Sequence, residues 1–235
     1  MVCETFQEPL QSVLAALLTT LPSPKGPLLD VGCGTGGKTP LLRSVCTPAV
    51  SLVGLDHDRQ ALREAVHNER ILAVAGDAHA LPLRPECCGA AVCIAAFGLF
   101  HDQRQALREV RRVVRSDGWI VVVTATTAWM PWSPRMRDWM ATWYARVGLT
   151  TDYWLTMPDP VVDLATLVQE TGWNDVRAGA FVLETEAASS QMALPLLTPA
   201  AMRQHLTPLD MREYDGIAAQ SEPELLPLML VVMGR

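Results

Sequence analysis

The sequence predicts an α/β protein built on a mostly parallel sheet with helices on both faces. Short apolar runs without polar alternation take turns with helical patterns, as expected for buried parallel strands joined by helices. The first such run, residues 27–31, ends in a glycine-rich turn, and helical periodicity returns over residues 38–45. A strand, a glycine turn and a helix N-terminus together form a nucleotide site at the carboxyl edge of a sheet.

The segment before this first strand predicts a helix over residues 4–20. Its apolar residues recur at helical spacing, which is typical of a helix that packs on a core. Pro22, Pro24, Gly26 and Pro27 follow and predict a stiff linker into the first strand.

The glycine turn fits two cofactors, and Asp30 discriminates between them. Gly32, Gly34 and Gly37 satisfy the GxGxxG pattern of a dinucleotide site, which is weak evidence alone. A carboxylate two residues before the first glycine would repel a pyrophosphate, whereas it would attract a cation such as the α-ammonium of S-adenosylmethionine. A nicotinamide-dependent oxidoreductase remains the alternative, as does a glycine turn with no ligand.

Asp30 with Gly32, Gly34 and Gly36 resembles the signature of the class I (Rossmann-like) S-adenosylmethionine-dependent methyltransferases, an acidic residue followed by GxGxG. The resemblance implies that these residues bind S-adenosylmethionine, with S-adenosylhomocysteine as the product. It also implies a seven-stranded Rossmann-like sheet whose last strand alone is antiparallel.

The second strand is predicted over residues 49–56 and ends in Asp56. An acid about 20 residues past the glycines is placed to accept hydrogen bonds from ribose hydroxyls. The alternative role, a helix cap, fits Asp58 better, because Asp58 directly precedes the helix predicted over residues 59–70. His57 is expected either to lie against the adenosine or to face solvent.

The third strand, residues 71–76, leads into a segment, residues 76–82, that resembles the adenine-recognition segment of the same family. By this resemblance, Asp77 accepts a hydrogen bond from the exocyclic amine of adenine. The backbone N–H of Ala78 donates to a ring nitrogen. An ordinary turn aspartate is the alternative role for Asp77.

The fourth strand is predicted over residues 89–97, and the family's methyl acceptor lies near its end. Residues 94–97, Ile-Ala-Ala-Phe, lack the Asn/Asp-Pro-Pro-aromatic sequence of enzymes that methylate exocyclic base amines, which favours a small-molecule acceptor. The resemblance implies that Ala95 contacts the cofactor, and Phe97 is placed to face the sulfonium. His101 is the candidate general base, and the alternative is a histidine that caps or braces the next helix.

That helix is predicted over residues 102–114, followed by a turn over residues 115–118 and a fifth strand over residues 119–123. The stretch 106–118 closely resembles methyltransferases of the ubiquinone/menaquinone-biosynthesis type. The whole resemblance covers residues 27 to about 125.

A tryptophan- and methionine-rich insert follows at about residues 126–160. We interpret it as a substrate lid, with Trp129, Trp132, Tyr144 and Tyr153 as substrate-binding residues. An extra core layer or the interface of a homodimer are the alternatives.

The C-terminal part completes the predicted single domain, residues 1–235. A helix is expected over residues 162–171, a sixth strand over 176–184, a helical insert at about 186–222, and a final strand over 226–233 beside the sixth.

Composition excludes several classes of protein. Hydrophobic residues make up 49% of the chain and charged residues 19%, which is typical of a globular protein. The net charge of −6 disfavours a nucleic-acid partner, and we interpret the arginines between residues 104 and 115 as a solvated helix face. The apolar runs are shorter than the ~20 residues of a membrane-spanning helix, and the first residues do not resemble a signal peptide.

The six cysteines predict no metal centre. They form no CxxC pair, and the histidines lack zinc-ligand spacing. We expect buried, reduced thiols in a cytoplasmic protein. The sequence therefore predicts transfer of a methyl group to an O, N, S or C nucleophile of a small, largely apolar or aromatic molecule. A cofactor-binding protein of the same fold without turnover is the other alternative.

Overall fold

The computed structural model describes residues 7–69, 71–126, 134–146, 160–182, 207–218 and 228–235. The chain forms two compact units. One contains Leu10–Thr124, Val161–Gly179 and Leu230–Arg235, and the other contains Met1–Pro9, Ala125–Pro160 and Ala180–Met229.

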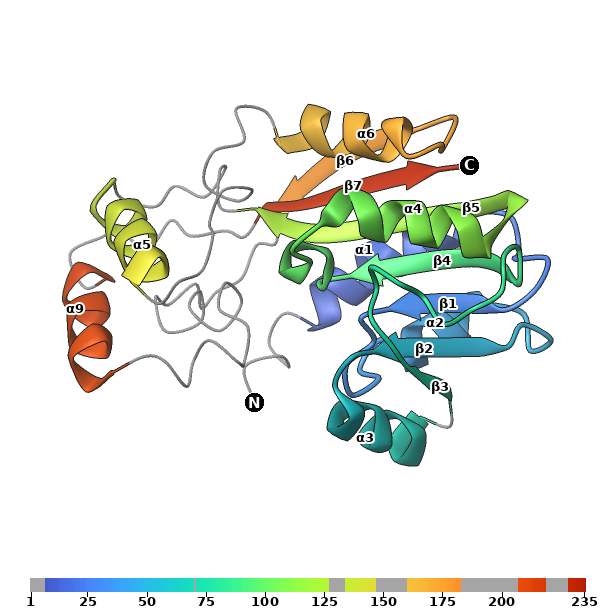
Figure 1. Cartoon of the computed structure of the whole chain (residues 1–235), viewed down its shortest axis with the longest axis horizontal. Helices are drawn as coiled ribbons and strands as arrows, with labels where there is room; N and C mark the ends of the chain where they lie inside the picture. Colours follow the sequence, from blue (N-terminus) through green and yellow to red (C-terminus); the bar gives the residue numbers. More distant parts are fainter. Residues whose placement is uncertain (1–6, 70, 127–133, 147–159, 183–206, 219–227) are drawn as a thin grey trace. The chain divides into compact units, whose positions relative to one another are not determined.

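A seven-stranded sheet organises the first unit, in the order β3-β2-β1-β4-β5-β7-β6 (Figure 1). Its strands are β1 (Leu28–Val31), β2 (Leu52–Asp56), β3 (Leu72–Ala75), β4 (Cys88–Ile94), β5 (Val114–Thr126), β6 (Arg177–Val182) and β7 (Leu228–Gly234). β1 pairs in parallel with β2 and β4, β2 with β3, and β4 with β5. Every residue of β1 and β4 is buried, which explains why Asp30 is the only charged residue in these two strands.

The last strand, β7, runs antiparallel and lies between β5 and β6. The backbone groups of Asn174, just before β6, and Arg235, just after β7, exchange two hydrogen bonds. The start of β6 therefore lies beside the end of β7, as an antiparallel pair requires. This confirms the predicted sheet and the predicted place of the final strand.

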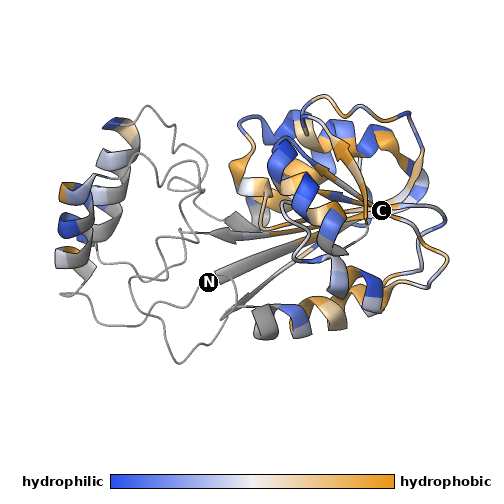
Figure 2. Cartoon of the chain, turned by 90° about the horizontal axis from the view of Figure 1, so that it is seen from below, coloured by the Kyte–Doolittle hydropathy of each residue, from blue (hydrophilic) through white to orange (hydrophobic). Residues whose placement is uncertain are grey.

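Helices cover both faces of the sheet. They are α1 (Gln7–Thr19), α2 (Thr39–Val45), α3 (Arg59–Glu69), α4 (Gln103–Val113) and α6 (Pro160–Glu170). In the view of Figure 1, α4 lies in front of the sheet and α1 behind it. The strands carry the apolar residues and the outward faces of the helices the hydrophilic ones (Figure 2). Leu14 and Leu18 of α1 are buried, so this helix packs on the core as predicted.

The fourth and fifth strands differ from their predicted bounds. β4 ends at Ile94, because Ala95 has φ +60° and Phe97–Leu99 form a short 3-10 helix, η1. β5 begins at Val114 and includes the predicted turn at 115–118 as a bulge. There the pairing moves from Cys88↔Val114 to Ala90↔Trp119. Pairing with β4 on both sides of the bulge overrides the local turn signal.

The arginines of α4 are only in part a solvated face. Arg112 donates to the backbone oxygens of Leu81 and Leu83, both at 2.9 Å, and pairs with Glu109. Arg111 donates to the backbone oxygen of Gly172 at 3.0 Å. These side chains fix α4 to the segment after β3 and to the end of α6, so the predicted interpretation was wrong for them.

The second unit contains two described helices, α5 (Pro134–Arg146) and α9 (Pro208–Ala218). The indole N–H of Trp139 donates to Glu213 at 3.1 Å, and Arg146 pairs with the buried Asp210. Trp139 and Trp143 lie nearly parallel, with ring centroids 6.4 Å apart. Within the described residues, no helix is long and apolar enough to cross a membrane.

Candidate cofactor and active site

Three carboxylates lie at the carboxyl edge of neighbouring strands. Asp30 is in β1, Asp56 ends β2, and Asp77 follows β3 by two residues. The parallel register Val31↔Leu55 and Asp56↔Ala75 brings these strand ends to one edge of the sheet. Sequence reasoning predicted this juxtaposition, because parallel strands end on the same side.

The glycine loop after β1 is held against the end of β2. The N–H groups of Gly32 and Cys33 both donate to the backbone oxygen of Leu55, at 2.8 and 3.0 Å. The N–H of Gly34 donates to Asp56 Oδ2 at 2.8 Å. Asp56 therefore fixes the loop while its carboxylate keeps further lone pairs for a ligand.

Glycine is required in this loop for two reasons. Gly32, Gly34 and Gly36 have φ of +76°, +55° and +83°, the region in which only glycine is relaxed. A Cβ on Gly32 would also lie 2.4 Å from Ala96 Cβ, whereas a Cβ on Gly34 would meet nothing within 4 Å. The loop thus packs closely on the end of β4 at Gly32 and leaves open space at Gly34.

Asp30 is a buried carboxyl with a strongly shifted pKa. Its exposed fraction is 6%, and its pKa is raised from 3.8 to about 7. Burial is the main cause, the negative charge of Asp56 adds to it, and Lys38 acts in the opposite direction. A buried carboxylate beside a second one favours a cationic ligand, because only a positive charge relieves both effects.

Asp58, and not Asp56, caps α3, as predicted. Asp58 Oδ1 accepts hydrogen bonds from the N–H groups of Gln60 and Ala61, at 2.7 and 3.2 Å, and so caps α3. Asp56 does not cap the helix; its carboxylate accepts hydrogen bonds from the N–H groups of Gly34 and Asp58. The side chain of His57 is 90% exposed, with Nδ1 3.4 Å from Asp56 Oδ1.

The segment after β3 contains an interaction that sequence reasoning missed. Asp77 Oδ1 accepts from the backbone N–H of His79 at 2.9 Å and lies 2.5 Å from His79 Nδ1. His79 Nε2 in turn lies 3.2 Å from the N–H of Asp102. The bond from the backbone N–H of His79 is that of a turn aspartate, the alternative role that the sequence offered for Asp77, whereas the contact with the His79 ring was not predicted. Ala78 between them is buried.

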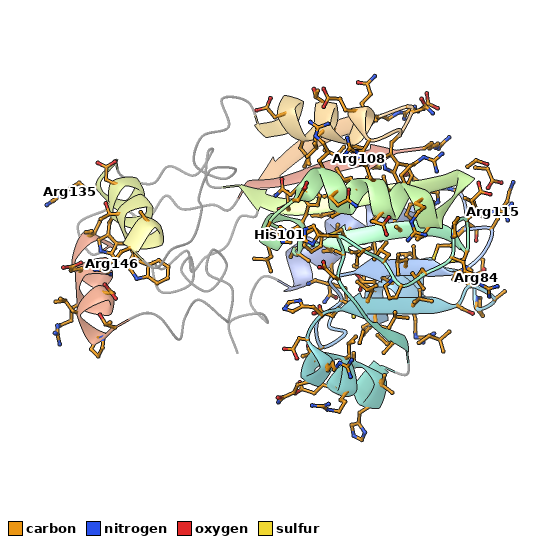
Figure 3. The ribbon with its side chains drawn as sticks, in the orientation of Figure 1. Arg84, His101, Arg108, Arg115, Arg135 and Arg146 are labelled. Atoms are coloured by element: carbon orange, nitrogen blue, oxygen red, sulfur yellow. The ribbon has the colours of Figure 1, made fainter. Side chains whose placement is uncertain are left out.

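The loop between β4 and α4 carries the remaining candidates. Ala95 is exposed and strained at φ +60°, and Phe97 is 1% exposed and packs edge-to-face on Phe100. His101 is exposed near the N-terminal end of α4 (Figure 3), and its ring centroid is 3.8 Å from that of His79. Asp102, not His101, caps α4 by accepting from the N–H of Gln105 at 2.9 Å.

The predicted substrate residues are only partly within the described structure. Trp129, Trp132 and Tyr153 lie outside the described residues. Tyr144 belongs to α5, in the second unit. Their roles, and the choice between a lid and an interface, stay predictions.

The described cysteines are all free thiols, namely Cys33, Cys46, Cys87, Cys88 and Cys93. Burial raises the pKa of Cys33 and of Cys88 to about 12, so these thiols stay protonated at neutral pH. Among the residues that the structure describes, no three histidine, cysteine or acidic side chains form a group that could hold a metal ion.

The chemistry of these three carboxylates fits an amino-acid nucleoside such as S-adenosylmethionine. Asp30 offers a buried negative charge to an ammonium, and Asp56 offers acceptors to sugar hydroxyls. Asp77 offers a carboxylate to an exocyclic amine. The open space at Gly34 admits a ligand against bare backbone.

Comparisons of the sequence with known proteins find methyltransferases. Residues 29–122 match the family described as "Methyltransferase domain". Over 100 residues the chain is 34% identical to demethylmenaquinone methyltransferase of Thermotoga maritima. This match covers 41% of the chain and 42% of that protein, so the chain spans less than half the length of the curated relatives that it matches.

Solved structures resemble the chain over nearly its whole length. The YcgJ protein of Bacillus subtilis has a TM-score of 0.66 at 15% identity, over 95% of this chain and 97% of that one. Phosphoethanolamine N-methyltransferase 2 of Haemonchus contortus, in complex with S-adenosyl-L-methionine, has a TM-score of 0.64 at 12% identity. That match covers 96% of this chain and 52% of that one. At such identities the likeness shows the fold. Residues 29–122 match the methyltransferase domain family, and the chain has a Rossmann-like fold that it shares with solved methyltransferases.

Proposed function

We propose that the protein is an S-adenosylmethionine-dependent methyltransferase that acts on a small, largely apolar or aromatic molecule. The observation that carries the proposal is the buried Asp30, whose pKa of about 7 beside Asp56 calls for a cationic ligand at the glycine loop. The matched family and the relative of Thermotoga maritima support the same activity.

In this proposal the chain's residues bind and align the reactants. Asp30 holds the α-ammonium, Asp56 the ribose hydroxyls, and Asp77 with the backbone of Ala78 the adenine edge. Ala95, strained at the end of β4, borders the reacting centre. S-adenosylmethionine supplies a methyl group already activated on a sulfonium, so alignment of the acceptor is the main task of the protein.

His101 is the proposed general base for acceptors that carry a proton. It lies in the loop that follows β4, is exposed, and its ring rests on that of His79. Deprotonation of a phenol, thiol or amine before or during transfer would leave the proton on His101. For an acceptor without such a proton, the same histidine would have no chemical role.

Cofactor binding tests the core of the proposal. In calorimetric titrations, the protein is expected to bind S-adenosylhomocysteine and not NAD. Asp30→Asn is expected to weaken this binding about 10- to 100-fold, because a charge-assisted contact is lost. Asp58→Asn is the matched control, since it removes a nearby carboxylate but keeps a residue that caps α3. Binding of NAD on this loop would favour the oxidoreductase instead.

Transfer of a labelled methyl group tests turnover. A panel of phenols, thiols, amines and quinol-like acceptors covers the proposed substrate class, and the name of the Thermotoga relative motivates the quinols. Cofactor binding without transfer to any class of acceptor would favour a binding protein of the same fold. The homodimer and the cytoplasmic location stay predictions, which light scattering and cell fractionation would check.

A further inference from the structure

We propose that His79 is a positioning residue that orients Asp77 for the amino group of an adenine ring. This inference rests on the proposed function, because it concerns how the cofactor site recognises its nucleobase. His79 comes from the turn after β3, and the same ring contacts the loop before α4. It therefore joins the two segments that flank the proposed site.

The contact with Asp77 involves a single carboxylate oxygen. Asp77 Oδ1 accepts the backbone N–H of His79 at 2.9 Å and lies 2.5 Å from Nδ1 of the His79 ring. Both partners occupy the same oxygen and so fix the plane of the carboxylate. Oδ2 is thereby directed as the acceptor for a ligand.

The contact made by the second ring nitrogen determines which nitrogen of His79 carries the proton. Nε2 lies 3.2 Å from the backbone N–H of Asp102, and a backbone N–H can only donate. Nε2 must then be unprotonated, so the proton of the neutral ring is on Nδ1. This tautomer makes His79 a donor toward Asp77, which is what a positioning role requires.

Burial distinguishes His79 from the groups that it supports. Its side chain is 13% exposed, whereas that of Asp77 is 60% exposed. The ring of Phe100 packs edge-on against the His79 ring, with centroids 5.8 Å apart, and the centroid of the His101 ring lies 3.8 Å away. The side-chain amide of Gln105 donates to the backbone oxygen of His79 at 3.1 Å. An anchored ring thus holds an exposed carboxylate that would otherwise sample several rotamers.

The consequence is selectivity at position 6 of the purine. A fixed carboxylate accepts a hydrogen bond from the 6-amino group of adenine and repels the 6-oxo group of hypoxanthine. A carboxylate free to rotate can turn away from the oxo group, so it discriminates less. Loss of His79 should therefore reduce discrimination more than it reduces affinity.

Calorimetric titration with S-adenosylhomocysteine and S-inosylhomocysteine tests this inference. We expect the wild-type protein to prefer the adenine compound by about 10- to 100-fold, the effect of one charge-assisted hydrogen bond. His79→Phe keeps a ring among Phe100 and His101 and keeps the backbone N–H that donates to Asp77, but it removes the side-chain donor. In this variant the preference should fall at least several-fold.

Two further variants separate the two ring nitrogens. The amide of His79→Asn can take the place of Nδ1 and should keep most of the preference, whereas the amide of His79→Gln lies closer to the place of Nε2 and should lose it. Should His79→Phe fail to fold, the comparison of these two variants carries the same test.

Equal weakening for both compounds, with their affinity ratio unchanged, would overturn the inference and leave His79 a purely structural role. A wild-type protein that binds neither compound would overturn the proposed function itself. A wild-type protein that binds both equally would show that Asp77 does not recognise the amine, and would overturn the inference alone.

Discussion

Asp30 combines a cost in stability with a gain in binding. Its pKa in the folded protein, about 7, lies above the value of 3.8 expected for the unfolded chain. The folded state therefore favours the protonated carboxyl, and stability declines as the pH rises from about 4 to about 7. The shift corresponds to a cost on the order of 4 kcal/mol above pH 7. A residue retained at such a cost is typical of a binding site.

Replacing Asp30 by asparagine should therefore act in opposite directions on the two properties. At pH 7.5, the ligand-free Asp30→Asn protein is expected to be about 1–2 kcal/mol more stable, because no charge is buried. Its affinity for S-adenosylhomocysteine should fall as described above. Urea denaturation measures the first effect, with Asp58→Asn again as the control. A destabilised variant would show that the carboxylate of Asp30 is already compensated in the empty protein.

At the scale of elements, the glycine loop depends on the position of each glycine. Gly34→Ala places a Cβ in the open space that we assign to the ligand, at φ +55°. We expect a loss of about 1–2 kcal/mol in stability from the strained backbone, together with a large loss of cofactor affinity.

Gly37→Ala is the matched control in the same loop. Its Cβ would also meet nothing within 4 Å, but Gly37 does not have a positive φ. This variant should fold at least as stably as the wild type and bind S-adenosylhomocysteine within a few-fold of it. Equal loss of affinity in both variants would place the ligand elsewhere on the loop.

The contacts that attach α4 to the segment after β3 lead to a second prediction at the scale of elements. Glu109 accepts from the N–H of Leu81 at 2.8 Å and pairs with Arg112, which lowers the pKa of Glu109 below its ordinary value of 4.5. Glu109→Ala leaves this N–H and the guanidinium without their acceptor. We expect a loss of about 1–3 kcal/mol in urea denaturation at pH 7.

The pH dependence provides the control for Glu109. Since its pKa is lowered in the folded state, its contribution is present above about pH 4.5 and disappears as the pH falls through the folded pKa. Wild type and Glu109→Ala should therefore converge in stability in acid. A difference that persists unchanged at pH 3 would assign the effect to packing.

At the scale of the whole molecule, the sequence was sufficient to predict the sheet and the row of carboxylates along its edge. Asp30, Asp56 and Asp77 each stand at or near the end of an apolar run, so parallel pairing alone brings them to one edge. The capping role of Asp58 followed from an equally local signal, and the antiparallel final strand beside the sixth followed from the family resemblance.

What the sequence could not predict depends on contacts between distant segments. Residues 115–118 contain an ordinary turn signal, yet pairing of β5 with β4 on both sides makes them a bulge. Phe97 continues an apolar run, yet the positive φ of Ala95 ends the strand at Ile94. The contact of His79 with Asp102 joins two loops 23 residues apart, and no periodicity encodes it.

Ligand binding, protonation and stability are linked through Asp30, and this yields a prediction for the whole protein. A cation beside Asp30 lowers its pKa, so binding releases a proton and affinity rises with pH up to about 7. Suppose that S-adenosylhomocysteine is present at 100 times its Kd at pH 8. It then stabilises the protein by about 2.7 kcal/mol, and by about 1.4 kcal/mol at pH 6 if its Kd there is tenfold higher.

Thermal denaturation with and without S-adenosylhomocysteine at the two pH values measures this linkage. The increase in Tm should be larger at pH 8 than at pH 6 in the wild type and nearly independent of pH in Asp30→Asn. His57→Gln removes the imidazole beside Asp56, and it should keep the pH dependence if Asp30 is the source. An increase in Tm that is equal at both pH values in the wild type would mean that the ammonium does not bind at Asp30, because a cation there must displace the proton.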